Sequence, residues 1–313
     1  MNSSFAIAIP VYNNVTQFCE CLKSLAMQNV KNFDVHIYDD ASTQDYKPLL
    51  TIFSELNVHY LLNEKNLGAL ANMQYAYNNL KNRYDLIMVM HEDDILHQNF
   101  VEAIYYSLQD GRIPDFIISN FKEFSDETEL KKNVQTIKST IAHSKISKKD
   151  LCFLVLKGQP LAFGSVVYNA KVFEQMNLDL NTYAEFADRP FLLNGLTDKA
   201  EVVVLAAPLY YYRSHTVSDT RWKKLGAKHI FNLLKLYHSI LVESKFLSVS
   251  LFKKYATGFV FESYKNLLLT KAAPSFISYL LMAGSKDLLS VKYSLFRVPF
   301  INKSSTFFKK FFN

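Results

Sequence analysis

Residues 86–94 read LIMVMHEDD, an apolar run of five residues that ends, after one histidine, in three consecutive acids. Such an apolar run is typical of a buried strand. Neighbouring carboxylates repel each other, and burying them without a partner is costly. Acids crowded at the end of a strand therefore indicate a bound cation, and their oxygens suit Mg²⁺ or Mn²⁺, ions that commonly bind phosphates. A solvated turn is the alternative, because Asp is common in turns.

Strands and helices alternate along the first half of the chain. The strands we expect lie at residues 6–11, 35–38, 58–62, 86–90 and 116–118, and the helices at 15–28, 68–81 and 99–108. This alternation favours an α/β fold with a largely parallel sheet flanked by helices. In open sheets of this type, ligands bind beyond the carboxyl ends of the strands. Polar residues follow four of these strands, which predicts a ligand site there: Asn13-Asn14, Asp39-Asp40, Asn63 with Asn66, and Glu92–Asp94.

The charge of the chain changes near Trp222. Residues 222–313 hold 15 Lys and Arg against 3 Asp and Glu, whereas residues 1–221 hold 20 against 26. We therefore expect a first domain over residues 1–221 and a basic, aromatic-rich helical extension over residues 222–313. A shared helical face in the extension is predicted from the spacing of Ile230, Leu234, Tyr237 and Leu241.

Two other features of the composition bear on location. The three cysteines form no CxxC pair, which favours reduced thiols in a cytosolic protein over a disulfide framework or a zinc site. We expect neither a secretory signal nor a transmembrane helix. The charge-mixed segment 122–149 is predicted to be a surface excursion, and a solvated insertion is favoured over a functional flap.

Four short motifs resemble those of family 2 glycosyltransferases in their order and spacing. They are Ile9–Asn13, Asp39–Ser42, Asn66–Gly68 and His91–Asp94. The resemblance covers residues 5–220 and implies the GT-A nucleotide-diphospho-sugar transferase fold. It also implies a sugar-donor half at about residues 1–120 and an acceptor half at about residues 121–221.

The resemblance implies roles for residues at the first three strand ends. Pro10 and Tyr12 would line the base pocket, Asp40 would accept a hydrogen bond from the base, most often uracil, and Asp39 would support that loop. A plain turn is the alternative for both acids. Asn66 precedes the helix at residues 68–81, and we expect it to be the N-cap of that helix. The helix N-terminus would then face the diphosphate.

Further donor-site and metal-site residues follow from the same resemblance. Gly68 belongs to the sugar-donor site, Asp94 would bind the metal, and Asp93 would touch the ribose. Glu92 stands where Asp is more usual, so its role is left open. Late in the domain, His215 would be a second metal ligand and Arg213 would pair with phosphate.

The catalytic base would be Asp188, at the start of a helix. Ala187 replaces the Glu that the family usually places before this Asp, and Asp188 could instead cap a helix ahead of Pro190. The pair Gly164-Ser165 matches a place where the family brings backbone close to the acceptor, although a tight strand bend explains it equally well.

These expectations describe a metal-dependent inverting glycosyltransferase of the hexosyl or N-acetylhexosaminyl class. It would use Mn²⁺ or Mg²⁺ and move a sugar from a UDP-sugar to a hydroxyl of a glycan or lipid-linked acceptor, in bacterial surface polysaccharide or lipopolysaccharide assembly. A nucleotidyltransferase and a non-catalytic nucleotide-sugar-binding protein are the alternatives. The former normally carries a Gly-rich basic loop after the first strand, whereas this chain has Tyr12–Val15 there.

The basic extension predicts where the protein acts. Lys residues mixed with Phe and Tyr suit an anionic membrane surface, so we expect a cytoplasmic protein with peripheral contact to the inner face of the membrane. A packing domain with a solvated basic face is the alternative. Nucleic acid is not an expected partner, because no nucleic-acid motif is present.

Overall fold

The computed structural model describes residues 3–108, 112–135, 143–157, 161–174, 176, 178–183, 187–214 and 227–268. The chain divides into two compact units. The first comprises Met1–Lys148, Leu161–Leu178 and Phe191–His215, and the second comprises Lys149–Pro160, Asp179–Pro190 and Thr216–Asn313. The expected boundary between residues 221 and 222 lies outside the described residues and stays a prediction.

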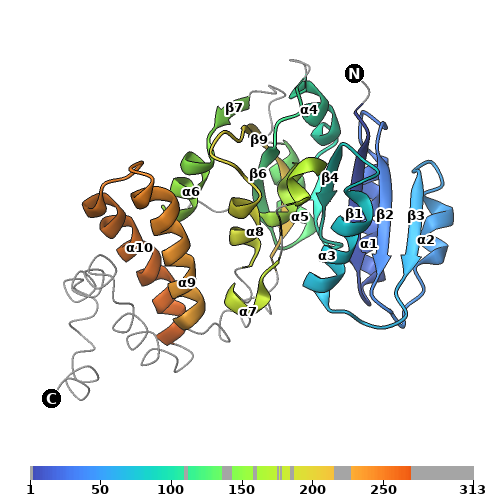
Figure 1. Ribbon diagram of the computed structural model, residues 1–313. Helices are drawn as coiled ribbons and strands as arrows, with labels where there is room; N and C mark the ends of the chain where they lie inside the picture. The colour runs from blue at the N-terminus through green and yellow to red at the C-terminus, as the bar shows by residue number, and fades with distance from the viewer. Residues whose placement is uncertain are drawn as a thin grey trace. The chain divides into compact units, whose positions relative to one another are not determined.

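A mixed sheet forms the centre of the first unit (Figure 1). Its described strands follow the order β3-β2-β1-β4-β8-β6-β9-β5, and β7 pairs with β9. Their bounds are Phe5–Val11 (β1), Asp34–Asp39 (β2), Val58–Leu62 (β3), Leu86–Val89 (β4), Ile95–Leu96 (β5), Phe116–Phe124 (β6), His143–Ile146 (β7), Val166–Asn169 (β8) and Val202–Arg213 (β9).

The sheet is parallel only in part. Strand β1 pairs in parallel with β2 and β4, and β2 with β3, as the alternation of strands and helices predicts. Strand β8 runs antiparallel between β4 and β6, and β9 runs parallel to β6 but antiparallel to β5 and β7. The sheet becomes mixed where the regular strand–helix alternation of the sequence ends.

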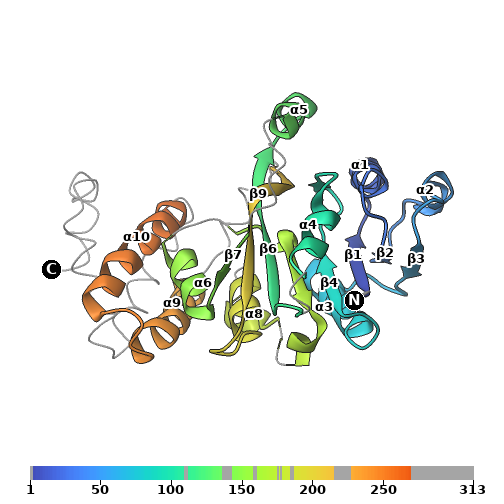
Figure 2. The same cartoon turned by 90° about the horizontal axis from the view of Figure 1, so that it is seen from above.

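Helices cover both faces of the parallel strands (Figure 2). Helix α1 (Val15–Ala26) and helix α4 (Phe100–Tyr106) pack on the face that carries Ile7 and Ile37, in one apolar core. Helix α3 (Ala69–Leu80) packs against β1 and β4 on the other face. The remaining described helices of this unit include α2 (Lys47–Ile52), which the sequence did not predict, and the 3-10 turns η1 (Phe163–Ser165) and η2 (Ala170–Glu174).

The segment expected to be a surface excursion is more regular than predicted. Strand β6 continues through Phe124, helix α5 (Glu127–Gln135) follows, and β7 pairs with β9. Helix α5 carries exposed charges, including an ion pair of 2.9 Å between Lys131 and Glu127. The preference for a solvated insertion over a functional flap stays a prediction.

The described part of the second unit is helical. Its elements are α6 (Lys148–Leu156), α7 (Leu180–Tyr183), α9 (Ala227–His238), the π-helical turn η5 (Ser239–Glu243) and α10 (Val249–Leu268). The residues predicted to share a helical face, Ile230, Leu234, Tyr237 and Leu241, are all buried. Helix α8 (Asp188–Asn194) begins in this unit and ends in the first. Within the described residues, no helix is both long and apolar enough to cross a membrane.

Candidate functional site

The loops that follow β1, β2 and β4 meet at one edge of the sheet. These strands run in parallel side by side, so their carboxyl ends share that edge. The backbone N–H of Tyr12, after β1, donates to both carboxylate oxygens of Glu92 at 3.2 Å. The N–H of Asn13 donates to the hydroxyl of Ser42, after β2, at 3.1 Å. The polar residues at these strand ends therefore come together as the sequence predicts.

Asp94 is the most strongly held acid of the site. Its side chain is fully buried, and its Oδ1 accepts a hydrogen bond of 2.8 Å from the backbone N–H of Arg213. Its Oδ2 accepts the hydroxyl of Tyr210. Burial, reinforced by the charge of Asp94, holds the pKa of Tyr210 well above its ordinary value, so the hydroxyl keeps its proton and donates. The Asp94 carboxylate is thus fixed from two sides.

Three side chains of this edge can hold a metal ion together. Ligand atoms of His91, Asp93 and Asp94 all lie within 4.8 Å of one another, and Nδ1 of His91 lies 3.4 Å from Oδ2 of Asp94. Two carboxylates and one imidazole fit a divalent ion such as Mn²⁺, which accepts oxygen ligands. His91 was not predicted as a ligand, because its spacing matches no zinc motif; the signal lies in its position three residues before Asp94. His215, the predicted second ligand, lies outside the described residues.

The Glu92 carboxylate accepts hydrogen bonds from other residues than those that hold Asp94. Its carboxylate accepts the N–H of Tyr12 and, at 3.2 Å, the hydroxyl of Tyr46. Burial raises the pKa of Glu92 to about 8, although these two donors work in the opposite direction. Glu92 therefore stabilises the loop after β1. This contact is a structural role for the Glu that stands where the family more usually has Asp.

Arg213 reaches the acid cluster, but its side chain is already engaged. Its Nε donates to the carbonyl of Asp93 at 2.8 Å, and its Nη2 pairs with Glu20 at 2.5 Å. The guanidinium also lies 4.5 Å from the centroid of the Phe124 ring. A guanidinium has five N–H donors, and the hydrogen bonds of Arg213 to described residues use only two of them. The phosphate contact stays a prediction.

Asp39 organises the turn that follows β2. Its Oδ1 accepts the N–H of Ser42 at 2.9 Å, and its Oδ2 accepts the hydroxyl of Tyr60 at 2.5 Å. The side chain is buried. This geometry is the loop-supporting role that the resemblance implies, and it is equally the turn role that was the alternative.

Asp40 ties the end of β2 to the loop before α3. Its Oδ1 accepts the side-chain amide of Asn63 at 3.0 Å and the N–H of Leu67 at 2.8 Å, and its Oδ2 accepts the N–H of Gly68 at 2.9 Å. A carboxylate offers about four acceptor positions, and the described residues fill three of those of Asp40. Contact with a base stays a prediction.

The predicted N-cap role of Asn66 is wrong. Helix α3 begins at Ala69, and the N-cap position is Gly68, which has φ of 86° and no side-chain cap. Asn66 is exposed to solvent. Asp40, far earlier in the chain, accepts the N–H groups of Leu67 and Gly68 instead. The hydrogen-bond acceptor just before α3 therefore comes from the residue that follows β2.

Pro10 and Tyr12, the residues expected to line a base pocket, lie at the end of β1 and directly after it. Pro10 belongs to β1 and pairs with Tyr38 of β2. Tyr12 follows β1, and 49% of its surface is exposed, so its ring is open to a ligand. Their contact with a base stays a prediction.

Gly164 has a structural reason in the fold. A Cβ added at this buried position would run into the hydroxyl of Tyr210, which donates to Asp94. The absence of a side chain at residue 164 therefore leaves room for Tyr210. The sequence did not predict a role for Tyr210, although it stands in a run of three tyrosines just before Arg213.

Asp188 is the first residue of α8 and belongs to the second unit. A negative charge in the first turn of a helix interacts favourably with the helix dipole. This position supports the alternative, in which Asp188 has a structural role at the start of the helix. Its role as the catalytic base stays a prediction.

Comparisons with known proteins give a consistent result. The family model described as Glycosyl transferase family 2 matches residues 6–174. Glycosyltransferase GlyA of Streptococcus pneumoniae is 23% identical over 232 residues, which is 71% of this chain and 32% of GlyA. The chain spans less than half the length of the curated relatives it matches.

Solved structures resemble the chain at low sequence identity. S. aureus TarS 1–349 in complex with UDP has a TM-score of 0.59 and 14% identity, with 82% of this chain and 70% of that chain covered. The complex of TarS 1–349 with UDP-GlcNAc has a TM-score of 0.56 and 15% identity, with 82% and 71% covered.

Proposed function

This chain belongs to glycosyl transferase family 2 and has the GT-A fold, and on that premise we propose that it transfers a sugar from a nucleoside diphosphate sugar to a hydroxyl group. The observation that carries the proposal is the edge where the loops after β1, β2 and β4 meet, with His91, Asp93 and Asp94 gathered beside them. This edge lies within the residues that the family model matches.

The proposed sugar donor is a UDP-sugar. TarS, which shares the fold, has been solved with UDP and with UDP-GlcNAc. Asp39 and Asp40 lie at the end of β2, and the described residues fill most of their acceptor positions but leave one on Asp40 Oδ2. Such an acceptor suits a base that carries an N–H, as uracil does. The UDP-GlcNAc complex of TarS also supports the hexosyl or N-acetylhexosaminyl class.

His91, Asp93 and Asp94 would hold a divalent ion, Mn²⁺ or Mg²⁺, with His215 as a further proposed ligand. Such an ion supplies positive charge that neutralises the departing diphosphate. The hydroxyl of Tyr210 and the N–H of Arg213 keep the Asp94 carboxylate in one orientation. Glu92 keeps the Tyr12 loop against the same edge.

The transfer we propose inverts the configuration of the sugar. Asp188 takes the proton of the acceptor hydroxyl, the hydroxyl oxygen bonds to the anomeric carbon, and the bond from that carbon to the diphosphate breaks on the opposite face. The nucleoside diphosphate leaves with the bonding electron pair. The proposed acceptor is a glycan or a lipid-linked glycan.

The setting we propose is the assembly of a bacterial surface polysaccharide or lipopolysaccharide, at the inner face of the membrane. It is supported by the excess of basic residues over 222–313, which we propose as a separate extension, and by the family. Basic and aromatic side chains on a helical extension suit an anionic lipid surface, where a lipid-linked acceptor would lie.

The test separates binding from turnover. UDP binding is measured by calorimetry with and without Mn²⁺, and UDP release from a panel of UDP-sugars is measured with candidate acceptors. We expect Asp94→Asn to lose the Mn²⁺-dependent part of UDP binding, and Asp188→Asn to keep UDP binding but lose transfer. Asp198→Asn, at an exposed acid, serves as the control and should resemble the parent protein.

Two outcomes would contradict the proposal. A parent protein that binds no nucleotide or nucleotide sugar has no sugar-donor site. A parent protein that binds UDP-sugars but never releases UDP is the non-catalytic alternative.

A further inference from the structure

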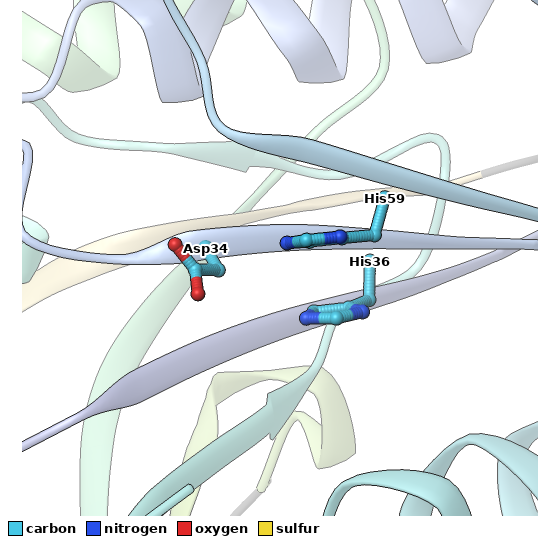
Figure 3. A group of neighbouring side chains, drawn as sticks. All are labelled: Asp34, His36 and His59. Atoms are coloured by element: carbon cyan, nitrogen blue, oxygen red, sulfur yellow. The ribbon is translucent and has the colours of Figure 1, made fainter. Parts of the chain in front are cut away.

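A second cluster of metal-binding side chains lies on the sheet, away from the carboxyl edge. His36 of β2 and His59 of β3 occupy directly paired positions. Asp34 precedes His36 by two residues and therefore projects from the same face. The two imidazole rings are stacked, with centroids 4.4 Å apart and planes at 12° (Figure 3). Ligand atoms of the three residues all lie within 4.8 Å of one another.

Neighbouring side chains hold this cluster in place. The hydroxyl of Tyr84 donates to Oδ2 of Asp34 at 2.7 Å and lies 2.8 Å from Nε2 of His36. The side-chain amide of Asn57 donates to Oδ1 of Asp34 at 2.6 Å. Hydrogen bonds of this kind orient the first ligands of protein metal sites.

The three side chains of the cluster differ in their exposure to solvent. His36 is buried, with 4% of its surface exposed, whereas His59 is exposed on β3, the edge strand of the sheet. An ion can therefore reach the imidazoles from solution past the edge strand. A cation lies near the cluster, since the guanidinium of Arg83 is 5.7 Å from the centroid of the Tyr84 ring.

We propose that Asp34, His36 and His59 form a binding site for Zn²⁺. Two imidazole nitrogens and one carboxylate oxygen form a donor set that zinc accepts in sites with three protein ligands and one open position. Imidazole ligands favour zinc over Mg²⁺, which prefers oxygen. The bound ion joins the edge strand β3 to β2 and stabilises that edge of the sheet.

This site is separate from the acid cluster at the carboxyl edge. Asp34 begins β2 and Asp39, five positions later, ends it, which is roughly 16 Å at about 3.3 Å per residue. Zinc binding at this site is therefore independent of the proposed transferase activity.

The test uses the full chain, Zn²⁺ alone and two matched histidine variants. His59→Gln removes an exposed ligand with little expected effect on folding, and His143→Gln removes an exposed histidine outside the cluster. In calorimetric titrations we expect the parent protein and His143→Gln to bind one more equivalent of Zn²⁺ than His59→Gln. Zn²⁺ should also raise the thermal midpoint more in the first two proteins than in His59→Gln, because binding to the folded state stabilises it.

Two further measurements sharpen the result. Visible absorption of the protein with Co²⁺ in place of zinc should show the bands of an imidazole-bound, four-coordinate ion in the parent protein and lack them in His59→Gln. Mn²⁺-dependent UDP binding should be the same in both. Identical zinc titrations of the parent protein and His59→Gln, or a parent protein that binds no zinc, would overturn the proposed site.

Discussion

At the scale of single residues, the Asp94 carboxylate depends on a tyrosine that the motifs do not contain. Tyr210 lies far along the chain, and it reaches Asp94 because residue 164 is a glycine. A motif search finds Asp94 from its neighbours in sequence. It cannot find Tyr210 or Tyr46, because their contacts with Asp94 and Glu92 join segments that are far apart in the sequence.

Removing the Tyr210 hydroxyl should weaken the site. In Tyr210→Phe the buried Asp94 carboxylate loses a donor, which costs about 2 kcal/mol of stability and should weaken Mn²⁺-dependent UDP binding. Tyr211→Phe is the matched control, because the Tyr211 hydroxyl is buried and has no hydrogen-bond partner among the described residues. Calorimetry and denaturant unfolding check both variants, and equal effects of the two substitutions would contradict this role for Tyr210.

A buried histidine near the site predicts a pH effect on stability. Burial lowers the pKa of His97 below its ordinary value of 6.5, so the folded state binds fewer protons than the unfolded state below that pH. Its contribution to stability is therefore complete above pH 6.5 and is lost as the pH falls towards the lowered pKa. His97→Asn keeps an acceptor for the N–H of Asn99 and removes the titration.

Denaturant unfolding at about pH 7 and about pH 5 checks this expectation. The parent protein should lose more stability between the two conditions than His97→Asn does. The same loss in both proteins would show that His97 does not contribute.

At the scale of elements, the start of α3 shows why the N-cap predicted at Asn66 is wrong. An Asn just before an apolar helical pattern is a reasonable N-cap in sequence. In the structure Asp40 supplies the acceptor from the end of β2, so the helix starts at Ala69 after a glycine in the left-handed region. The start of this helix is thus decided by a contact between elements and not by its own flanking residues.

Two glycine substitutions should change stability in opposite directions. Gly68→Ala places a side chain at a φ of 86°, with nothing within 4 Å of the new Cβ, so the cost is backbone strain of about 1–2 kcal/mol. Gly258→Ala, inside α10 and also with open space around it, should stabilise the protein by about 0.5–1 kcal/mol. Unfolding curves check both, and a neutral Gly68→Ala would argue against a strained helix entry.

At the scale of the whole molecule, sequence patterns predict the regular half of the fold best. The first four parallel strands and helices α1, α3 and α4 follow from apolar runs and helical spacing, whereas α2 does not. The direction of β8 and the full length of β9 do not, because antiparallel insertion between β4 and β6 depends on long-range pairing. The change in charge composition predicts a domain boundary at residue 222. The segments 149–160 and 179–190 also belong to the second unit, but no change in composition sets them apart.

The pairing of β6 with β9 has a consequence for the alignment of the site. Opposite Ser119 and Asn120 the register of β9 shifts twice, and the side chains of these two residues bond to Leu209 and Ala206 of β9. Because side chains alternate along a strand, these irregularities select which tyrosine of the run points at Asp94. An insertion or deletion of one residue between positions 206 and 208 would turn Tyr210 to the other face of β9. The Asp94 carboxylate would then lose the hydroxyl that binds it, while the sheet itself still formed.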